Sequence, residues 1–363
     1  MSEAAFIRAA CKRFFAHHCG VRRGEGPLPS IVGQQGPQGL DRTQVDWLAS
    51  TAQRIQDRIE TVLEGKSEVV RLTLTVLLAE GHLLIEDVPG VGKTLLAKAL
   101  ARAVDCTVRR IQFTPDLLPS DVTGVTVYDQ HRGEFEFKPG AVFANLVVGD
   151  EINRASPKTQ SALLECMGEH QVTVDGTTYV LEAPFMVVAT QNPVEMEGTY
   201  PLPEAQRDRF MARVAMGYPA PAAELRMLEG HAAANPIDDL QPVADTADVV
   251  KLIETVRAVY VSDEVKQYVI NLVSATRDHP DLRLGASPRA SLHLIRAARA
   301  HAVLGGRGFV LPDDVKTLAV AVLAHRLIPT AEARIGRRDA QQIVADLLDR
   351  VPVAVSSGGQ RRS

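Results

Sequence analysis

The chain contains 363 residues, of which 45% are hydrophobic and 23% are charged, and its formal net charge is −4. One hydrophobic core rarely organises this many residues, so we expect two domains and a tail. The acidic balance argues against a protein dedicated to nucleic acid, and no apolar run approaches the ~18 residues of a membrane span. The four cysteines are too few for a disulfide framework, and the first residues lack the apolar core of a secretory signal, so we expect a cytoplasmic protein.

Residues 1–40 differ in composition from the rest, because a short basic stretch is followed by a run rich in Gly, Pro and Gln. Their His and Cys side chains match no usual zinc spacing, so we interpret the segment as a disordered tail. From Asp41, which can cap a helix, apolar residues recur at helical spacing. A second helix is expected over 68–80, with Ser67 as its cap.

Short apolar runs then alternate with helical stretches, which predicts an α/β fold with a parallel sheet covered by helices on both faces. The expected strands are 83–85, 108–113, 146–148 and 185–189. After about Tyr218 we expect no further strand, and helix starts follow at Asp245, Ser262, Ser287 and Pro312. The sequence therefore predicts an α/β domain over 41–220, an all-helical domain over 221–351 and a flexible C-terminal tail over 352–363.

The strongest local signal is a loop between an expected strand and an expected helix. Its residues are Asp87, Val88, Pro89, Gly90, Val91, Gly92, Lys93, Thr94 and Leu95. Such a loop directs backbone N–H groups and a helix N-terminus at an anion. In this pattern Lys93 reaches the β- and γ-phosphates and Thr94 offers its hydroxyl to magnesium, although Asp87 stands where the generic pattern has glycine. We therefore predict a site for ATP and Mg²⁺.

Polar residues end two later strands at the same expected edge of the sheet. Asp150 and Glu151 follow one strand, and Asn192 follows the next. We assign Asp150, together with Thr94, to the metal and nucleotide, and Glu151 to the activation of the attacking water. The amide of Asn192 can orient that water without adding charge.

Two arginines complete the set of candidates. Arg209 lies just past the last polar loop of the α/β part. Ser287 as N-cap and Pro288 at the first helical position place Arg289 in the first turn of a helix, from which its guanidinium can reach across a domain cleft towards phosphate oxygens. Considered singly, each arginine is more often a partner in a surface ion pair.

Together these motifs resemble the MoxR family, in the helix-2-insert branch of the AAA+ ATPases. The stretches that match lie between about residues 60 and 330, and they are 111–121 (IQFTPDLLPSD), 150–155 (DEINRA), 189–193 (ATQNP), 200–206 (YPLPEAQ), 208–210 (DRF) and 285–289 (GASPR). The resemblance implies an ATP hydrolase whose helical part is a lid domain. It assigns Lys93 and Thr94 to Walker A and Asp150 and Glu151 to Walker B, and the remaining implied roles are sensor 1 for Asn192, sensor 2 for Arg289 and arginine finger for Arg209.

The resemblance also implies two β-hairpin insertions, one over 122–137 with its turn at 129–133 and one over 171–181 around Asp175 and Gly176. Relatives act as ring-shaped, chaperone-like remodellers, so we expect a homo-oligomeric ring, a hexamer, that assists maturation or assembly of a partner such as a von Willebrand factor A domain protein. Two departures stand out. Lys66 replaces a glutamine near the adenine pocket, and Arg207 adds a second candidate finger.

Three alternatives stay open at this point. The chain could be the ATPase motor subunit of a chelatase-like enzyme, a nucleic-acid motor, or a binding protein that has lost hydrolysis. The acidic balance weighs against the nucleic-acid motor, and so does the first hairpin, whose turn carries only His131 and Arg132 as basic residues.

Overall fold

The computed structural model describes residues 40–88, 90–192, 199–219, 221, 224–225, 237 and 239–353. Residues 1–39 of the expected N-terminal tail, with their His and Cys side chains, lie outside the described residues. Pro89 of the loop, Ala220 at the expected domain boundary and 354–363 of the expected C-terminal tail also lie outside them. Within the described ranges, no helix has the length and apolar character that a membrane span requires.

Two helices precede the sheet. The first, α2 (Arg42–Glu60), is capped by Asp41 as predicted, because the Asp41 side chain accepts a hydrogen bond from the Thr43 N–H. The second, α3 (Ser67–Leu78), begins at Ser67 with Lys66 in the N-cap position, so the prediction of Ser67 as cap was wrong. The Ser67 hydroxyl instead donates to the Glu60 carboxylate at 2.7 Å, an ionised acceptor that forms a stronger bond than a neutral one.

A five-stranded parallel sheet follows, in the order β2-β5-β8-β1-β9. Its strands are β1 (Leu83–Glu86), β2 (Val108–Gln112), β5 (Leu146–Asp150), β8 (Met186–Gln191) and β9 (Ala212–Val214). The four predicted strands are thus confirmed to within two residues at each end. Parallel strands need crossover connections, and helices α4 (Lys93–Ala103) and α6 (Pro157–Glu169) lie in two of them.

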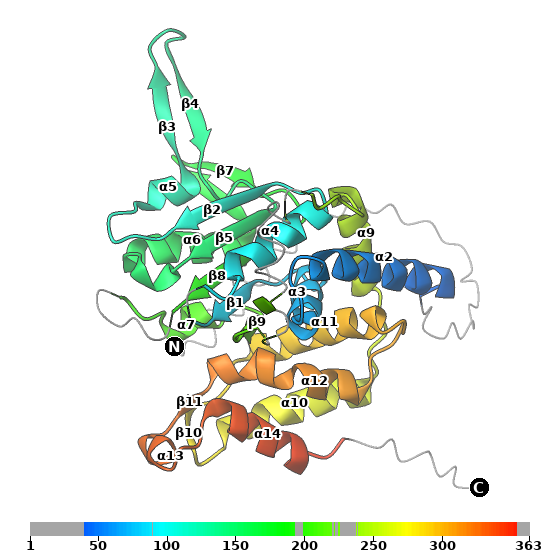
Figure 1. Cartoon of the computed structure of the whole chain (residues 1–363). Coiled ribbons are helices and arrows are strands. Elements are labelled where there is room, and N and C mark those ends of the chain that lie inside the picture. Colours follow the sequence, from blue (N-terminus) through cyan, green and yellow to red (C-terminus); the bar gives the residue numbers. More distant parts are fainter. Residues whose placement is uncertain are drawn as a thin grey trace, which may run out of the picture. The chain divides into compact units, whose positions relative to one another are not determined.

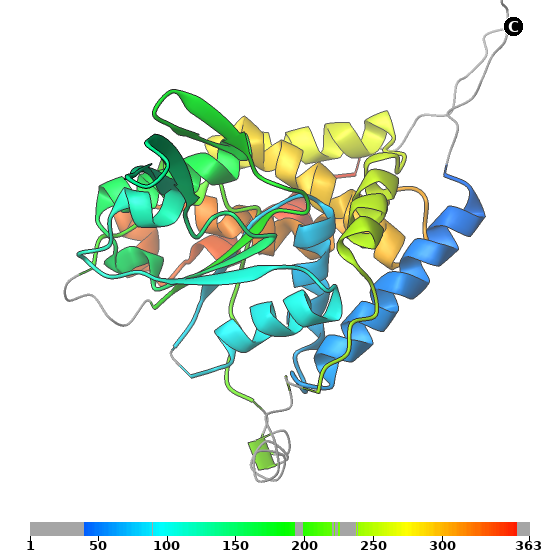
Figure 2. The same ribbon diagram turned by 90° about the horizontal axis from the view of Figure 1, so that it is seen from above.

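The two faces of the sheet pack into different hydrophobic clusters, because successive side chains on a strand point to opposite faces. Leu83 and Ile85 belong to a cluster with α2, α3, α4 and the C-terminal helices, whereas Leu84 belongs to a cluster with α5 (Pro119–Thr123) and α6. Figure 2 shows α2 in blue beside α4 in cyan, in agreement with their contacts. The sheet is therefore covered on both faces, as predicted.

Both expected hairpins are present. The longer one, β3 (Gly124–Asp129) with β4 (Glu134–Pro139), projects away from the sheet (Figure 1). The shorter one pairs β6 (Gln171–Val174) with β7 (Thr177–Val180). Its turn residues Asp175 and Gly176 have φ angles of +50° and +79°, the left-handed geometry that a two-residue hairpin turn demands.

The C-terminal part is mostly helical, and its helices gather on one side of the sheet (Figure 1). They are α9 (Thr246–Arg257), α10 (Asp263–Arg277), α11 (Pro288–Leu304), α12 (Pro312–Leu323), α13 (Ala331–Ile335) and α14 (Ala340–Arg350). The four predicted helix starts are confirmed. The prediction that strands end after Tyr218 was wrong, because β10 (Leu282–Leu284) pairs with β11 (Ile328–Pro329). Strands of three and two residues are too short to produce an alternating pattern.

Candidate active site

The carboxyl ends of the central strands meet at one edge of the sheet, which we call the carboxyl edge. The register pairs Glu86 at the end of β1 with Gln191 at the end of β8, and Gln112 at the end of β2 with Asp150 at the end of β5. The residues that follow each strand therefore come together. This edge holds the loop that begins at Asp87, the two acids and Asn192.

The loop after β1 has the backbone that an anion cradle needs. Gly90 and Gly92 have φ angles of +84° and +91°, a region that side chains other than glycine rarely adopt. Gly92 is the N-cap of α4, so the helix N-terminus opens into the loop. The Lys93 ammonium donates to the Asp87 carbonyl at 2.6 Å, which places its charge across the mouth of the loop.

Asp87 and Lys66 hold the segment after β9 against this loop. The Asp87 carboxylate accepts hydrogen bonds from the Val88 N–H at 2.7 Å and from the Gly217 N–H at 2.6 Å. The Lys66 ammonium donates to the carbonyls of Met216, Gly217 and Tyr218, at 2.5, 3.0 and 3.0 Å. Asp87 and Lys66, which both depart from the expected patterns, thus share one task, which is to fix 216–218 beside the loop after β1.

Asp150 lies at the centre of the carboxyl edge and is 6% exposed. The Thr94 hydroxyl is 3.2 and 3.4 Å from its two carboxylate oxygens, and the Thr190 hydroxyl donates to it at 3.2 Å. The Arg110 guanidinium contacts it at 2.5 Å from β2. A hydroxyl and a carboxylate oxygen are ligands that Mg²⁺ prefers, and the carboxylate already attracts a cation, so the residues present fit this metal.

Glu151 follows directly, in a left-handed conformation with φ of +57°. Its N–H donates to the Thr190 hydroxyl at 3.0 Å. Its carboxylate accepts from the Gln112 amide at 3.0 Å and pairs with Arg154 at 3.1 Å. A carboxylate held in this way points from the turn towards the end of the neighbouring strand β2. Asn192, 6% exposed, follows β8 at the same edge.

The two candidate arginines lie elsewhere. The turn 207–211 leads into β9, and the Met211 N–H donates to the His82 carbonyl at 2.8 Å, just before β1 begins. This turn therefore lies at the opposite end of β1, which we call the amino edge. Arg209 follows α7 (Glu204–Arg207), and its Nε is buried without a hydrogen-bond partner among the described residues. No ion pair engages Arg209 within that part of the chain.

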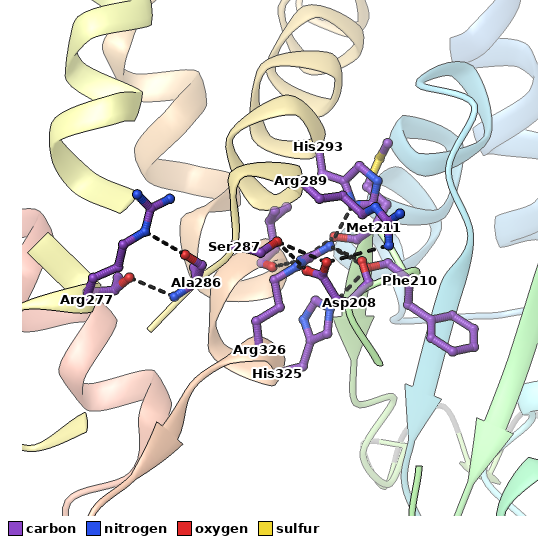
Figure 3. Close-up of polar contacts among 12 residues, drawn as sticks. Asp208, Phe210, Met211, Arg277, Ala286, Ser287, Arg289, His293, His325 and Arg326 are labelled. Carbon is purple, nitrogen blue, oxygen red and sulfur yellow. Dashed lines mark hydrogen bonds and ion pairs between the residues drawn. The ribbon is translucent and has the colours of Figure 1, made fainter. Parts of the chain in front are cut away.

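Arg289, at the start of α11, also contacts the amino edge. Its guanidinium is 3.6 Å from the Asp208 carboxylate and is 46% exposed (Figure 3). Ser287 occupies the N-cap position of α11 as predicted, but its hydroxyl donates to Asp208 at 2.9 and 3.0 Å and makes no capping bond. The structure thus brings Arg289 together with the residue that precedes Arg209.

Several residues of these two groups are absent from the sequence prediction. At the carboxyl edge they are Gln112 and Arg110, which contact the two acids from β2. The alternation of polar residues at the end of β2 was available as a signal for them. At the amino edge they are Asp208 and Arg326, which join the turn to the lid, and no local pattern indicates that contact.

Comparison with known proteins agrees with this geometry. Residues 82–212 match the "ATPase family associated with various cellular activities (AAA)", and residues 274–347 match the AAA lid domain. The chain is 49% identical to the uncharacterized protein YeaC of Bacillus subtilis, over 84% of this chain and 95% of YeaC. It is 43% identical to the chaperone MoxR1 of Mycobacterium tuberculosis, over 78% of this chain and 77% of MoxR1.

A solved structure is similar as well. The crystal structure of a putative ATPase from Cytophaga hutchinsonii superposes with a TM-score of 0.81 at 40% identity, covering 86% of this chain and 98% of that one. The strand order, the lid and these relatives lead to one conclusion. The chain belongs to the MoxR family of AAA+ ATPases and is an enzyme that binds and hydrolyses ATP.

Proposed function

We propose that this ATPase is Mg²⁺-dependent, assembles as a homo-oligomeric ring, a hexamer, and acts as a chaperone-like remodeller that assists maturation or assembly of partner proteins. The observation that carries the ring is the separation of the two groups of candidate residues along β1. We place the nucleotide-binding domain at 41–220 and the lid at 221–351, with tails at 1–40 and 352–363.

The separation follows from the direction of the strands. Lys93 and Thr94 follow the carboxyl end of β1, whereas the turn that carries Arg209 is bonded to His82 at the amino end. The five residue steps from His82 to Asp87 span roughly 16 Å of extended chain. An arginine at the amino edge is therefore poorly placed to serve the phosphates of its own chain.

A second copy of the chain resolves this separation. If the amino edge of one copy faces the carboxyl edge of the next, Arg209 and Arg289 approach the neighbour's γ-phosphate. Such an interface joins two different surfaces, and a rotation that closes produces a ring. The half-exposed guanidinium of Arg289 supports this assignment, because it retains capacity for an anion, and among the described residues no ion pair engages Arg209.

Within one copy, the carboxyl edge would hold the nucleotide and position the water. Lys93 and the loop N–H groups would bind the phosphates, and Thr94 with Asp150 would hold Mg²⁺, which would supply positive charge to the phosphate oxygens. Glu151 takes the proton of the attacking water, and Asn192 orients that water. The Gln112 amide donates to the Glu151 carboxylate at 3.0 Å.

The test uses mixtures of two inactive variants. Arg209→Ala keeps the phosphate-binding loop, and Lys93→Ala keeps the arginine but cannot bind ATP. Arginine fingers contribute on the order of 10³- to 10⁵-fold in well-studied phosphoryl-transfer enzymes, so each variant alone should be nearly inactive. Mixed rings, confirmed by native mass spectrometry, should recover part of the ATPase rate. Mixed rings without recovery would contradict action between neighbours, and a wild-type rate for Arg209→Ala alone would transfer the role to Arg207.

The remodelling role rests on the similarity to the chaperone MoxR1. We expect the partner to be a von Willebrand factor A domain protein and the ring to work in the cytoplasm. Its thiols Cys106 and Cys166, both free, fit a reducing compartment. Glu151→Gln loaded with ATP should retain a partner longest in a pulldown, and identification of that partner by mass spectrometry tests its class.

A further inference from the structure

Arg326, in the 3-10 turn Ala324–Arg326 of the lid, is a buried arginine that contacts the amino edge from the lid side. Its side chain is 2% exposed. Its Nε donates to the Asp208 carboxylate at 2.8 Å, and its other nitrogens donate to the carbonyls of Asp208, Phe210 and Met211 at 3.2, 2.7 and 3.3 Å (Figure 3). The backbone on both sides of Arg209 is therefore held by one guanidinium.

The same guanidinium also reaches α11. Arg326 donates to Nδ1 of His293 at 2.6 Å, and His293 lies one helical turn after Arg289. Burial, and then the neighbouring Arg326, lowers the pKa of His293 to about 2, so the imidazole is neutral and accepts this bond. Burial lowers the pKa of Arg326 to about 10 while Asp208 opposes the change, so Arg326 remains charged at neutral pH.

The start of α11 is fixed independently within the lid. The Ala286 N–H donates to the Thr276 hydroxyl at 2.9 Å, and Arg277 donates to the Ala286 carbonyl at 3.0 Å (Figure 3). A side chain at Gly285 would lie 2.6 Å from the Arg277 Cα, so this loop packs directly on α10. The start of α11 is therefore rigidly packed on α10. The contacts of Asp208 with the lid join the turn of Arg209 to this rigid part of the lid.

Asp208 has two partners at hydrogen-bond distance and a third that is more distant. Ser287 and Arg326 bond it at 2.8 to 3.0 Å, whereas Arg289 is 3.6 Å away and half exposed. A half-exposed pair at that distance contributes little. Arg289 can therefore move to a phosphate without leaving the Asp208 carboxylate unpaired, because Ser287 and Arg326 still satisfy it.

We propose that Arg326 and Asp208 are positioning residues that lock the lid to the Arg209 turn, so that Arg209 and Arg289 reach the neighbouring copy's nucleotide as one rigid unit. The proposal rests on the proposed function, because it presupposes that both arginines act on a neighbour. It assigns a role in the ATPase reaction to a lid residue that touches neither nucleotide nor water.

The test uses Asp208→Asn in the full chain, which keeps the shape of the side chain and removes its charge. Small misplacements of reacting groups cost up to about 100-fold, so we expect kcat to fall about 10- to 100-fold. The dissociation constant for ATP should stay within about twofold, since the carboxyl edge is unaltered. Mixing with Lys93→Ala, whose arginines are intact, should restore part of the rate, as it does for Arg209→Ala. A purely structural role would impair the variant's own site and would not be rescued.

Matched variants separate this role from general stability. Glu80→Gln breaks another pair between the α/β part and the lid, in which Arg257 bonds Glu80 at 2.7 Å, and it should leave kcat unchanged. If Asp208→Asn fails to fold, Ser287→Ala removes a bond to Asp208 without loss of a helix cap and should lower kcat severalfold with the same rescue. Arg326→Lys keeps the charge but loses the planar fork, and it should resemble Asp208→Asn.

Two results would overturn the inference. One is a wild-type kcat for Asp208→Asn. The other is a low kcat that Lys93→Ala does not rescue while it does rescue Arg209→Ala, since that would confine the defect to the variant's own site. If Arg209→Ala is not rescued either, the proposed action between neighbours fails, and the inference fails with it.

Discussion

The two ends of β1 differ in charge and in the way they are built. At the carboxyl edge, acids and cations lie together, and the acids lie at or just after the ends of strands β1 and β5. At the amino edge, arginines predominate around Asp208, and they come from the α7 turn, the start of α11 and the turn after α12. The first edge is made by local chain geometry and the second by tertiary contacts. Arginines at one end of β1 and the proposed phosphate site at the other suit a head-to-tail assembly of copies.

The largest expected effect follows from loss of the Lys93 ammonium, because it removes nucleotide binding and turnover together. Lys93→Ala removes the ammonium that lies across the loop, and hydrogen bonds to charged groups are among the strongest in proteins, so ATP affinity should fall on the order of 100-fold or more. Titration with a fluorescent nucleotide measures this change. Lys98→Ala, an exposed position on the same helix, is the control. Equal affinity in the two variants would contradict the assigned role of the loop.

Glu151→Gln should separate binding from turnover at the same edge. The amide keeps the size of the side chain but cannot take a proton, and general bases contribute about 10²- to 10⁴-fold. We expect an unchanged dissociation constant and a rate lowered by that range, measured by phosphate release. Hydrolysis at the wild-type rate would show that another group activates the water.

Arg289→Ala should affect the amino edge less than Arg209→Ala does. Its guanidinium is loosely paired, and a single charge-assisted contact is worth roughly 1.5–3 kcal/mol, which corresponds to a kcat about 10- to 100-fold lower. Own-chain ATP affinity should not change. Arg296→Ala, an exposed residue two turns further along α11, provides the comparison. A weaker affinity for ATP with a normal kcat would indicate that Arg289 binds the nucleotide of its own chain.

Gln112→Ala should give a smaller effect of opposite sign. Removal of the amide that donates to Glu151 makes the carboxylate a better proton acceptor, while Arg154 still holds it. We expect the basal rate to rise about two- to fivefold, since an exposed hydrogen bond of this kind is worth on the order of 1 kcal/mol. A large loss of rate would mean that Gln112 is needed to direct Glu151.

A buried cluster away from both edges should leave the rate unaltered. The Asp314 side chain is 2% exposed and accepts from Arg307 at 2.6 and 2.7 Å and from the Leu311 N–H at 2.8 Å. Breaking such a buried pair costs about 3–5 kcal/mol, so Asp314→Ala should lower the free energy of unfolding by that amount. Denaturant titration measures the loss, and kcat of the folded fraction should equal that of wild type. A change in kcat would show that the Asp314 cluster also affects the ATPase reaction, which would contradict its assignment as a stabilising cluster only.

The sequence predicts the carboxyl edge well, because Asp150, Glu151 and Asn192 each end an apolar strand. The amino edge is different. The positions of Arg209 and Arg289 in the sequence make them candidates, but only the resemblance assigns them roles. The bond between Arg326 and Asp208 joins residues 118 positions apart, which no periodic pattern indicates. Ser67 shows a related limit of sequence-based prediction. Its hydroxyl could cap a helix or bond another side chain, and only the folded structure shows that it donates to Glu60.

The base of the long hairpin is tightly packed where it joins the core. A side chain at Gly124 would lie 2.5 Å from the Lys138 carbonyl oxygen, and one at Gly140 would lie 2.3 Å from that of Val122, so the chains touch at the base. The same base continues directly from α5, and α6 holds the preceding segment through a 2.7 Å bond from Thr159 to the Leu117 carbonyl.

Because the base of the β3–β4 hairpin is tightly packed, a small rotation of the base would move the distant tip of the hairpin much further. Each hairpin strand has six residues and is roughly 20 Å long, so a tilt of about 10° at α5 displaces the far end by roughly 3 Å. That far half carries the touching rings of Tyr128 and Phe135, the latter 74% exposed. Glu151 connects to α6 through the five residues 152–156. A small displacement of Glu151 that is passed through α6 and α5 would therefore be enlarged at the exposed aromatic tip of the hairpin.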